Sequence, residues 1–183
     1  MEQHDKSEVG NKVEIIQLKP VGFVRNQSRE PNWGPSLGAL NWQERAEKMK
    51  EYIQSVSEIE IDPALDGILD GIEEFSHLMI IYWSHLVPPD RRSQLRGHPM
   101  GNKDFPLVGI FATRSPIRPN SILTTVVRLT GRQGNTLQVT GLDALDGSPV
   151  LDIKPYYPEG KHENVKVPDW MKQVNHEFGE VSS

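Results

Sequence analysis

The sequence contains no cysteine and no long apolar run. Without cysteine, disulfides, thiolate nucleophiles and cysteine-ligated zinc are excluded. No stretch approaches the roughly 20 consecutive apolar residues that a membrane-spanning helix needs. Residues 1–12 are polar and lack the apolar region of a signal peptide. We therefore expect a cytoplasmic protein without a membrane partner, and we expect residues 1–12 to form a disordered tail.

Aromatic residues are also scarce, at 7% of 183 residues, whereas glycine and proline are frequent, with 15 and 14 copies. This many turn-forming residues argues against an all-helical bundle. The length suits one domain, and an apolar share of 36% suffices for one core. We assign residues 13–158 to this domain. Residues 159–183 form a C-terminal tail that can carry a short docked helix.

Negative charge exceeds positive charge, with a formal net charge of -5, which by itself argues against a nucleic-acid partner. The distribution of charge changes this interpretation. Eight Lys or Arg face a single acid between Arg91 and Arg132, so this segment carries +7 and the remainder carries -12. Because the local field steers anionic ligands, a basic surface is expected on an acidic protein.

Alternating apolar residues, bounded by turn residues, predict a series of short strands. These cover residues 13–26, 58–62, 75–86, 106–113, 121–130, 136–142 and 150–153. The strongest of these patterns, 75–86, is apolar on both faces, which predicts cover on both sides. One helix is expected after the N-cap Asn41, with an apolar stripe at Trp42, Ala46, Met49, Ile53 and Val56. The predicted fold is mostly β: a small single-domain barrel of about six to eight strands with one peripheral helix.

Two arginines, Arg114 and Arg118, lie four residues apart in a loop that Pro116 and Pro119 stiffen. Arginine binds carboxylates and phosphates through two parallel hydrogen bonds, so a rigid loop with two arginines suits an anion site. A surface loop with solvated arginines has the same composition. The residues alone leave both interpretations open.

Three carboxylates, Asp143, Asp146 and Asp152, follow the last predicted hairpin. They can bind a ribose diol or an amine, although Asp-Gly is also a common turn. Asp152, Lys154 and Tyr156 alternate and therefore share one face of an extended segment. Such a trio can assist proton transfer, or it can be a polar rim.

His77 and His85 lie eight residues apart on one predicted strand, roughly 27 Å end to end, so they cannot share a metal ion. No other His or carboxylate spacing indicates a metal site. A GxGxxG loop and a Walker A loop are both absent from the sequence, which disfavours a Rossmann enzyme, and no Ser-His-Asp arrangement stands out.

Three blocks give a family resemblance: Gly71–Leu78, Gly109–Asn120 and Asp143–Tyr156, with an opening Pro20–Arg25. Over residues 18–158 the sequence resembles the TrmO/YaeB family, the tRNA N6-threonylcarbamoyladenosine methyltransferases. The resemblance implies a small homodimeric β-barrel that binds S-adenosylmethionine without a Rossmann fold. The implied reaction is methylation of N6 of threonylcarbamoyladenosine in the tRNA anticodon loop.

The resemblance also implies site residues. Those expected to contact the cofactor are His85, Leu86, Arg114, Asp143, Ala144, Leu145, Asp146, Gly147 and Ser148. Those expected to contact the substrate are Arg91, Arg92, Arg96, Arg118, Asn120 and Lys154. The general base is not identified by the sequence, and Tyr156 and Asp152 are its candidates.

The sequence departs from the family after Asn120, where Ser121-Ile122-Leu123 replaces the usual Pro-Ile-Gly. Losing that glycine places a side chain where the backbone or a ligand can approach closely. Two alternative functions therefore stay open: methyl transfer to a small-molecule acceptor, and non-catalytic binding of S-adenosylmethionine.

Overall fold

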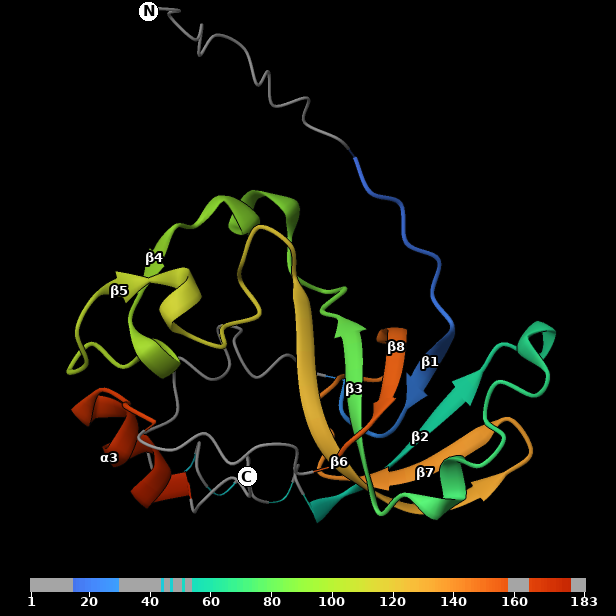
Figure 1. Cartoon of the computed structure of the whole chain (residues 1–183). Helices are drawn as coiled ribbons and strands as arrows, with labels where there is room; N and C mark the ends of the chain where they lie inside the picture. Colours follow the sequence, from blue (N-terminus) through green and yellow to red (C-terminus); the bar gives the residue numbers. More distant parts are fainter. Residues whose placement is uncertain are drawn as a thin grey trace, which may run out of the picture.

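The computed structural model describes residues 15–29, 44, 47, 51, 54–157 and 165–178. Its centre is a closed barrel of six strands in the order β1-β2-β7-β6-β3-β8 (Figure 1). All neighbouring pairs are antiparallel. The barrel strands are β1 (Gly22–Arg25), β2 (Val56–Ile61), β3 (His77–Trp83), β6 (Ile122–Gln133), β7 (Thr136–Thr140) and β8 (Pro149–Pro155). The prediction of a mostly-β barrel is confirmed.

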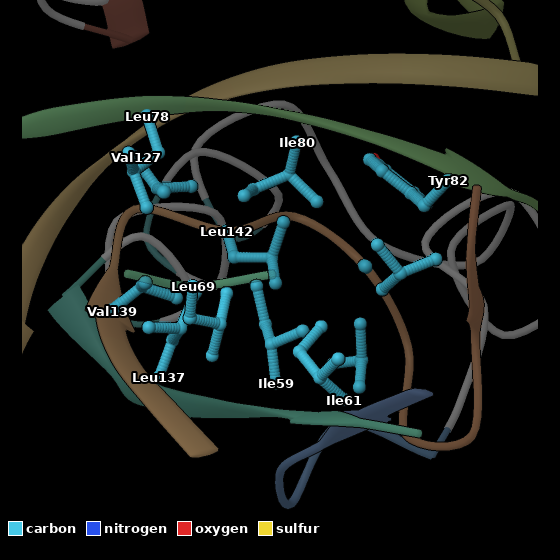
Figure 2. Close-up of a cluster of buried hydrophobic side chains, with 13 residues drawn as sticks. Ile59, Ile61, Leu69, Leu78, Ile80, Tyr82, Val127, Leu137, Val139 and Leu142 are labelled. Carbon is cyan, nitrogen blue, oxygen red and sulfur yellow. The ribbon is translucent and has the colours of Figure 1, made fainter. Parts of the chain in front are cut away.

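The barrel encloses one apolar core, which Figure 2 shows from inside. Its side chains come from alternate positions of the strands because successive residues of a strand point to opposite faces. Leu69 and Leu142, which lie outside the strands, also pack into this core. The largest fully buried members are Tyr82, Ile59, Leu78, Ile80, Leu137 and Leu142.

Strand β3 shows the limit of the sequence pattern. Its inward residues Leu78 and Ile80 are fully buried, whereas the outward Met79 and Ile81 are only half-buried. Within one chain, the outer face is therefore covered only in part. Barrel closure buries one row of side chains, and an apolar outer row does not by itself bring a second layer.

Close packing at the barrel seam depends on one glycine. Strand β1 pairs with β2 on one side and, through Gly22 and Phe23, with β8 on the other. A Cβ added at Gly22 would lie 2.3 Å from the Glu60 carbonyl oxygen. Only glycine allows the backbones of β1 and β2 to approach this closely. Gly22 therefore permits β1 to pair with β2 while it also pairs with β8.

A small lobe, residues 84–121, leaves the barrel after β3 and returns to it at β6 (Figure 1). It contains β4 (Arg96–Gly97) paired with β5 (Val108–Gly109). Three 3-10 turns complete it: η3 (Pro89–Ser93), η4 (Pro99–Gly101) and η5 (Ile110–Ala112). The predicted strand over 106–113 was wrong apart from β5. We call residues 84–121 the basic lobe, because it carries six Lys or Arg and two Asp.

The predicted helix is described only in part. Glu44, Glu47, Glu51 and Gln54 are helical and exposed, as expected for its polar face. Of the predicted apolar stripe, Trp42, Ala46, Met49 and Ile53 lie outside the described residues. The fifth member was wrong, because Val56 begins β2.

The C-terminal tail contains α3 (Asp169–Phe178), within the stretch where a docked helix was expected. Its Trp170 packs against Phe105 of the basic lobe, with ring centroids 6.2 Å apart. Figure 1 shows α3 on the side of the barrel from which the lobe projects. The basic lobe and α3, which both lie outside the barrel, therefore contact one another.

The described part of the chain contains neither a membrane-spanning helix nor a cluster of metal ligands. No helix there is long and apolar enough to cross a lipid bilayer. No three His, Asp or Glu side chains there come together as metal ligands.

Candidate functional site

The turn between β7 and β8, residues 143–148, is the segment in which the expected cofactor residues are densest. Backbone hydrogen bonds attach it to the end of β1: Asp146 N–H donates to Ser28 O at 2.8 Å and Gly147 N–H donates to Val24 O at 2.8 Å. Gly147 has φ +75°, a left-handed conformation that favours glycine. The turn is therefore fixed in shape by contacts distant in sequence.

Asn26 is the residue that locks this turn, and sequence reasoning missed it. Its side-chain Nδ2 donates to Ala144 O at 2.9 Å and to Ser57 Oγ at 3.0 Å. Its backbone N–H donates to Asp146 Oδ1 at 3.1 Å. Asn26 thereby joins β1, β2 and the turn, and orients one carboxylate of the site. A lone Asn at the end of a strand gives no sequence signal of this role.

A second carboxylate, Asp143, is held from inside the barrel. Its Oδ1 accepts a hydrogen bond from the Tyr82 hydroxyl at 2.7 Å and another from Thr125 Oγ1. Tyr82 is almost fully buried, and it ends the inward row of β3. The sequence did carry a signal here, since a tyrosine hydroxyl in an apolar row requires a polar partner.

The Asp143 carboxylate is therefore fixed through one oxygen. Both hydrogen bonds from described residues go to Oδ1, so Oδ2 is the atom with which Asp143 can accept a hydrogen bond from a ligand. A carboxylate held in this way is pre-organised, because its orientation is set before a ligand binds.

His85 lies just beyond the end of β3, facing the same turn. Its Nδ1 is 3.3 Å from Ser148 Oγ, and a Cβ on Gly147 would lie 3.9 Å from its Nε2. Burial lowers the pKa of His85, and the nearby Asp146 carboxylate partly opposes this by raising it. The imidazole is thus neutral at neutral pH.

The turn at 143–148 and its neighbours therefore form one cluster at the end of the barrel where β1 and β3 finish. It combines two oriented carboxylates, a neutral imidazole and the buried hydroxyl of Ser148. Carboxylate oxygens accept hydrogen bonds from hydroxyl pairs and from ammonium groups, and they stabilise positive charge. Ala144 and Leu145, which belong to the same turn, are buried apolar residues.

The arginines of the basic lobe divide into two kinds. Arg92 and Arg118 are held: Arg92 donates to Val87 O at 3.0 Å and lies over the Trp83 ring, while Arg118 donates to Thr113 O at 2.9 Å. The Nε atoms of both are buried and lack a hydrogen-bond partner among the described residues. The other predicted site residues of the lobe, apart from His85, are exposed: Leu86, Arg91, Arg96, Arg114 and Asn120.

Arg114, an expected cofactor residue, makes no side-chain hydrogen bond with another described residue. It stands exposed between Thr113 and Ser115, both of which are fixed by hydrogen bonds. Its backbone is therefore constrained while its guanidinium remains available to an anion.

The predicted trio on β8 does not reach this cluster as a unit. Lys154 and Asp152 form an ion pair with each other at 2.6 Å on the outer face of the barrel. The Tyr156 backbone N–H donates to His77 O, at the start of β3. His85 lies beyond the opposite end of this strand, and seven extended residues span roughly 20 Å. The structure thus separates Tyr156 from the turn at 143–148.

Two surface hollows lie away from the cluster. One is lined by residues 73–76 and 129–132, and the other by residues 19–20, 22–23 and 60–63. Neither contains a predicted site residue. The first is bounded by Arg132, which forms an ion pair with Glu73 at 2.8 Å and donates to Leu69 O at 2.9 Å. Arg132 and Glu73 are therefore already paired with each other, which points to a structural role for them.

Known proteins resemble this chain over most of its length. Residues 44–161 match the tRNA-methyltransferase O N-terminal domain. An "S-adenosyl-L-methionine-binding protein" of Archaeoglobus fulgidus is 40% identical over 143 residues, covering 78% of this chain and 90% of the relative. A "Probable S-adenosyl-L-methionine-binding protein" of Methanothermobacter thermautotrophicus is 40% identical over 144 residues, covering 79% and 92%.

Solved structures give the same result. The crystal structure of TrmO from Pseudomonas aeruginosa superposes with a TM-score of 0.60 and 29% sequence identity. The match covers 85% of this chain and 62% of the solved chain, so this chain spans less than two thirds of that protein.

Proposed function

Since the chain belongs to the tRNA-methyltransferase O N-terminal domain family, we propose that it is an S-adenosylmethionine-dependent methyltransferase. The proposed acceptor is N6 of threonylcarbamoyladenosine in the anticodon loop of tRNA. The observation that carries the proposal is the turn at 143–148, which the barrel fixes against His85. This turn belongs to a sequence block of the family and is pre-organised in the structure.

The chemistry of the cluster suits the cofactor. S-adenosylmethionine carries a ribose diol, an ammonium, a carboxylate and a positive sulfonium, and when bound it supplies an electrophilic methyl group. The oriented carboxylates of Asp143 and Asp146 can accept hydrogen bonds from the diol or the ammonium. Arg114 can pair with the cofactor carboxylate. His85, Leu86 and residues 143–148 are therefore the proposed cofactor contacts.

The residues of this chain contribute mainly by positioning. Methyl transfer requires an in-line acceptor about 3 Å from the methyl carbon, and fixing that geometry supplies much of the rate enhancement. Asn26 and Tyr82 serve this end by fixing the two carboxylates before ligands bind. Neutral His85 keeps a second positive charge away from the sulfonium at neutral pH.

The basic lobe supports tRNA as the substrate. It carries six Lys or Arg against two Asp, and it follows directly from β3, which ends two residues before His85. Phosphate contacts through such residues provide most of the affinity of proteins for nucleic acids, and this affinity falls as salt rises. We assign the substrate contacts to Arg91, Arg92, Arg96, Arg118 and Asn120. Lys154 is a weaker candidate, since it is paired with Asp152.

We also propose that the chain forms a homodimer. The outer faces of β3 and β6 carry an incompletely buried apolar row that includes Met79, Ile81 and Val126. Association of two copies would remove this row from water. Sedimentation equilibrium measures the mass of the particle, and a monomer at micromolar concentration would contradict this assignment.

A labelled-methyl assay tests the function. The protein is incubated with S-adenosylmethionine carrying a labelled methyl group and with total RNA, prepared with and without the threonylcarbamoyl modification. We expect label only in the modified RNA. Label in a small molecule but not in RNA would establish the small-acceptor alternative. Cofactor binding without any labelled acceptor in a cell extract would indicate a non-catalytic binding protein.

Arg114→Ala tests the cofactor site separately. We expect at least tenfold weaker binding of S-adenosylmethionine in calorimetry, because a charged hydrogen-bond pair is lost. Arg91→Ala is the matched control, since Arg91 is also exposed in the basic lobe but is assigned to RNA. Unchanged affinity in a folded Arg114→Ala variant would remove Arg114 from the site.

A further inference from the structure

Phe111 is the most exposed aromatic side chain in the described part of the chain. Its relative exposure is 79%, whereas Phe23 and Phe75 are exposed by 42% and 37%. A single exposed apolar side chain is common on a protein surface. What distinguishes Phe111 is that it lies in the basic lobe, beside the guanidinium of Arg118.

The ring of Phe111 is held in place although it is exposed. It lies in η5, whose first residue Ile110 is buried. Thr113 closes this turn, with its backbone N–H and its Oγ1 both donating to Ile110 O. A ring on a fixed backbone loses little conformational freedom on binding, so it is suited to recognition.

Arg118 covers one side of the ring. Its guanidinium carbon lies 5.8 Å from the centre of the Phe111 ring, and the guanidinium is tied to Thr113 O. The neighbouring Ile117 is buried and anchors this part of the loop. With Arg118 on one face and 79% of the residue exposed, the opposite face of the ring is open to a planar ligand.

The charges around Phe111 indicate which ligand this is. Arg91, Arg96, Lys103 and Arg114 are exposed in the same lobe, against Asp90 and Asp104. An exposed aromatic ring among exposed cations is the combination that binds single-stranded nucleic acid: bases stack on the ring while cations contact phosphates. A second copy of this lobe would bring the same excess of positive charge and be repelled.

We infer that Phe111, backed by Arg118, is a stacking platform for an unpaired base of the RNA substrate. The inference rests on the proposed function, since it takes the substrate to be RNA with an unpaired loop. It adds a binding site outside the cofactor cluster. The interaction is sequence-tolerant, because every base has a π face.

Fluorescence anisotropy with two labelled RNAs tests the platform. One is a hairpin with an unpaired loop, and the other is a fully paired duplex of the same stem sequence. We expect Phe111→Ala to weaken binding of the hairpin by about tenfold and to leave binding of the duplex unchanged, because only the loop offers an unstacked base. Phe111→Trp should retain hairpin binding, whereas Phe111→Leu should lose it, since leucine is apolar but has no π face.

Phe23→Ala is the matched control, because Phe23 is an exposed aromatic on β1 outside the lobe. It should bind both RNAs as the unsubstituted chain does. Equal hairpin binding by Phe111→Ala and the unsubstituted chain would overturn the inference. A halved particle mass for Phe111→Ala in sedimentation would overturn it too, in favour of contact with a second copy.

These outcomes are separable from failure of the proposed function. The platform is measured by RNA binding, and the methyl transfer by the labelled-methyl assay. If the unsubstituted chain methylates modified tRNA while Phe111→Ala binds the hairpin normally, only the platform is wrong. If the chain binds the hairpin through Phe111 but transfers no methyl group, only the methyltransferase activity is wrong.

Discussion

The barrel and the basic lobe differ in how their side chains are placed: the barrel buries apolar side chains, whereas the lobe exposes several of them. In the barrel, alternate side chains of six strands point into one core, and Val24, Ile59, Leu78, Ile80 and Val150 are fully buried. In the lobe, the only strands are two residues long, and Leu95 and Phe111 are more than 70% exposed. The barrel therefore supplies stability, while the lobe presents exposed groups that can bind a ligand.

The proposed cofactor site lies where the two regions meet, and it draws residues from both. Asp143 and Asp146 are oriented by barrel residues, whereas Arg114 belongs to the lobe. A rigid region fixes the groups that must be positioned accurately. A less densely packed region offers the groups that must adapt to a large substrate.

The largest expected effect tests the stability side of this comparison. Ile80→Ala should lower the free energy of unfolding by about 2–5 kcal/mol, because it removes a fully buried side chain from the core. Leu95→Ala in the lobe should change it by no more than about 0.5 kcal/mol, since Leu95 is 72% exposed. Urea denaturation followed by circular dichroism measures both. Similar losses of unfolding free energy for the two variants would show that the barrel and the lobe do not differ in their contribution to stability.

A smaller effect is expected at the junction. Tyr82→Phe removes the hydroxyl that donates to Asp143, which leaves this carboxylate with Thr125 as its described partner. We expect a loss of about 1–3 kcal/mol in unfolding free energy. We also expect weaker binding of S-adenosylmethionine, measured by calorimetry. Tyr157→Phe is the matched control, because it removes the hydroxyl of an exposed tyrosine outside the cluster. Normal cofactor binding by Tyr82→Phe would show that the barrel does not position the cluster.

The smallest effect concerns pH. The pKa of His85 is lowered in the folded protein from an unfolded value of 6.5. As pH falls through about 6.5, the unfolded state binds the proton first, so the free energy of unfolding decreases until the pH passes the folded pKa. Above about pH 7 both states are neutral at this group, and no effect remains.

Thermal melting at a series of pH values measures this effect. His85→Gln cannot titrate, so the unsubstituted chain should lose stability relative to it between neutral and mildly acidic pH. NMR titration of the His85 ring gives the pKa directly. Asp146→Asn should lower this pKa further, because it removes the charge that raises it. If the melting temperatures of the unsubstituted chain and of His85→Gln change equally with pH, the cluster does not lower the pKa of His85.

The sequence predicted the barrel well because alternation is a local pattern. The inward rows of β3, β6 and β7 follow directly from the positions of Leu78, Val127 and Leu137. The pattern failed for 106–113, because a short apolar run does not reveal whether a partner strand is available. In the structure only Val108 and Gly109 of that run pair with β4.

The candidate site was predictable only in outline. The acidic turn at 143–148 stood out because Asp and Gly cluster there. Asn26 did not, since three of its four hydrogen-bonding partners lie 31 to 120 positions away in the sequence, and only Ser28 is close. Tyr156 lies beside His77, at the opposite end of β3 from His85, and its alternation with Asp152 in the sequence gave no indication of this position. Contacts of this kind depend on barrel closure, which no local pattern specifies.

One detail of strand pairing bears on how this molecule can change. Trp83 and Ile122, which flank the basic lobe, are paired neighbours in adjacent strands. The lobe therefore begins and ends at neighbouring positions on the barrel. The entropy cost of closing a loop grows only with the logarithm of its length. Insertions or deletions within the lobe that spare His85, Leu86 and Arg114 can thus be accommodated at little cost to the barrel, so that substrate choice is free to diverge while the barrel stays unchanged.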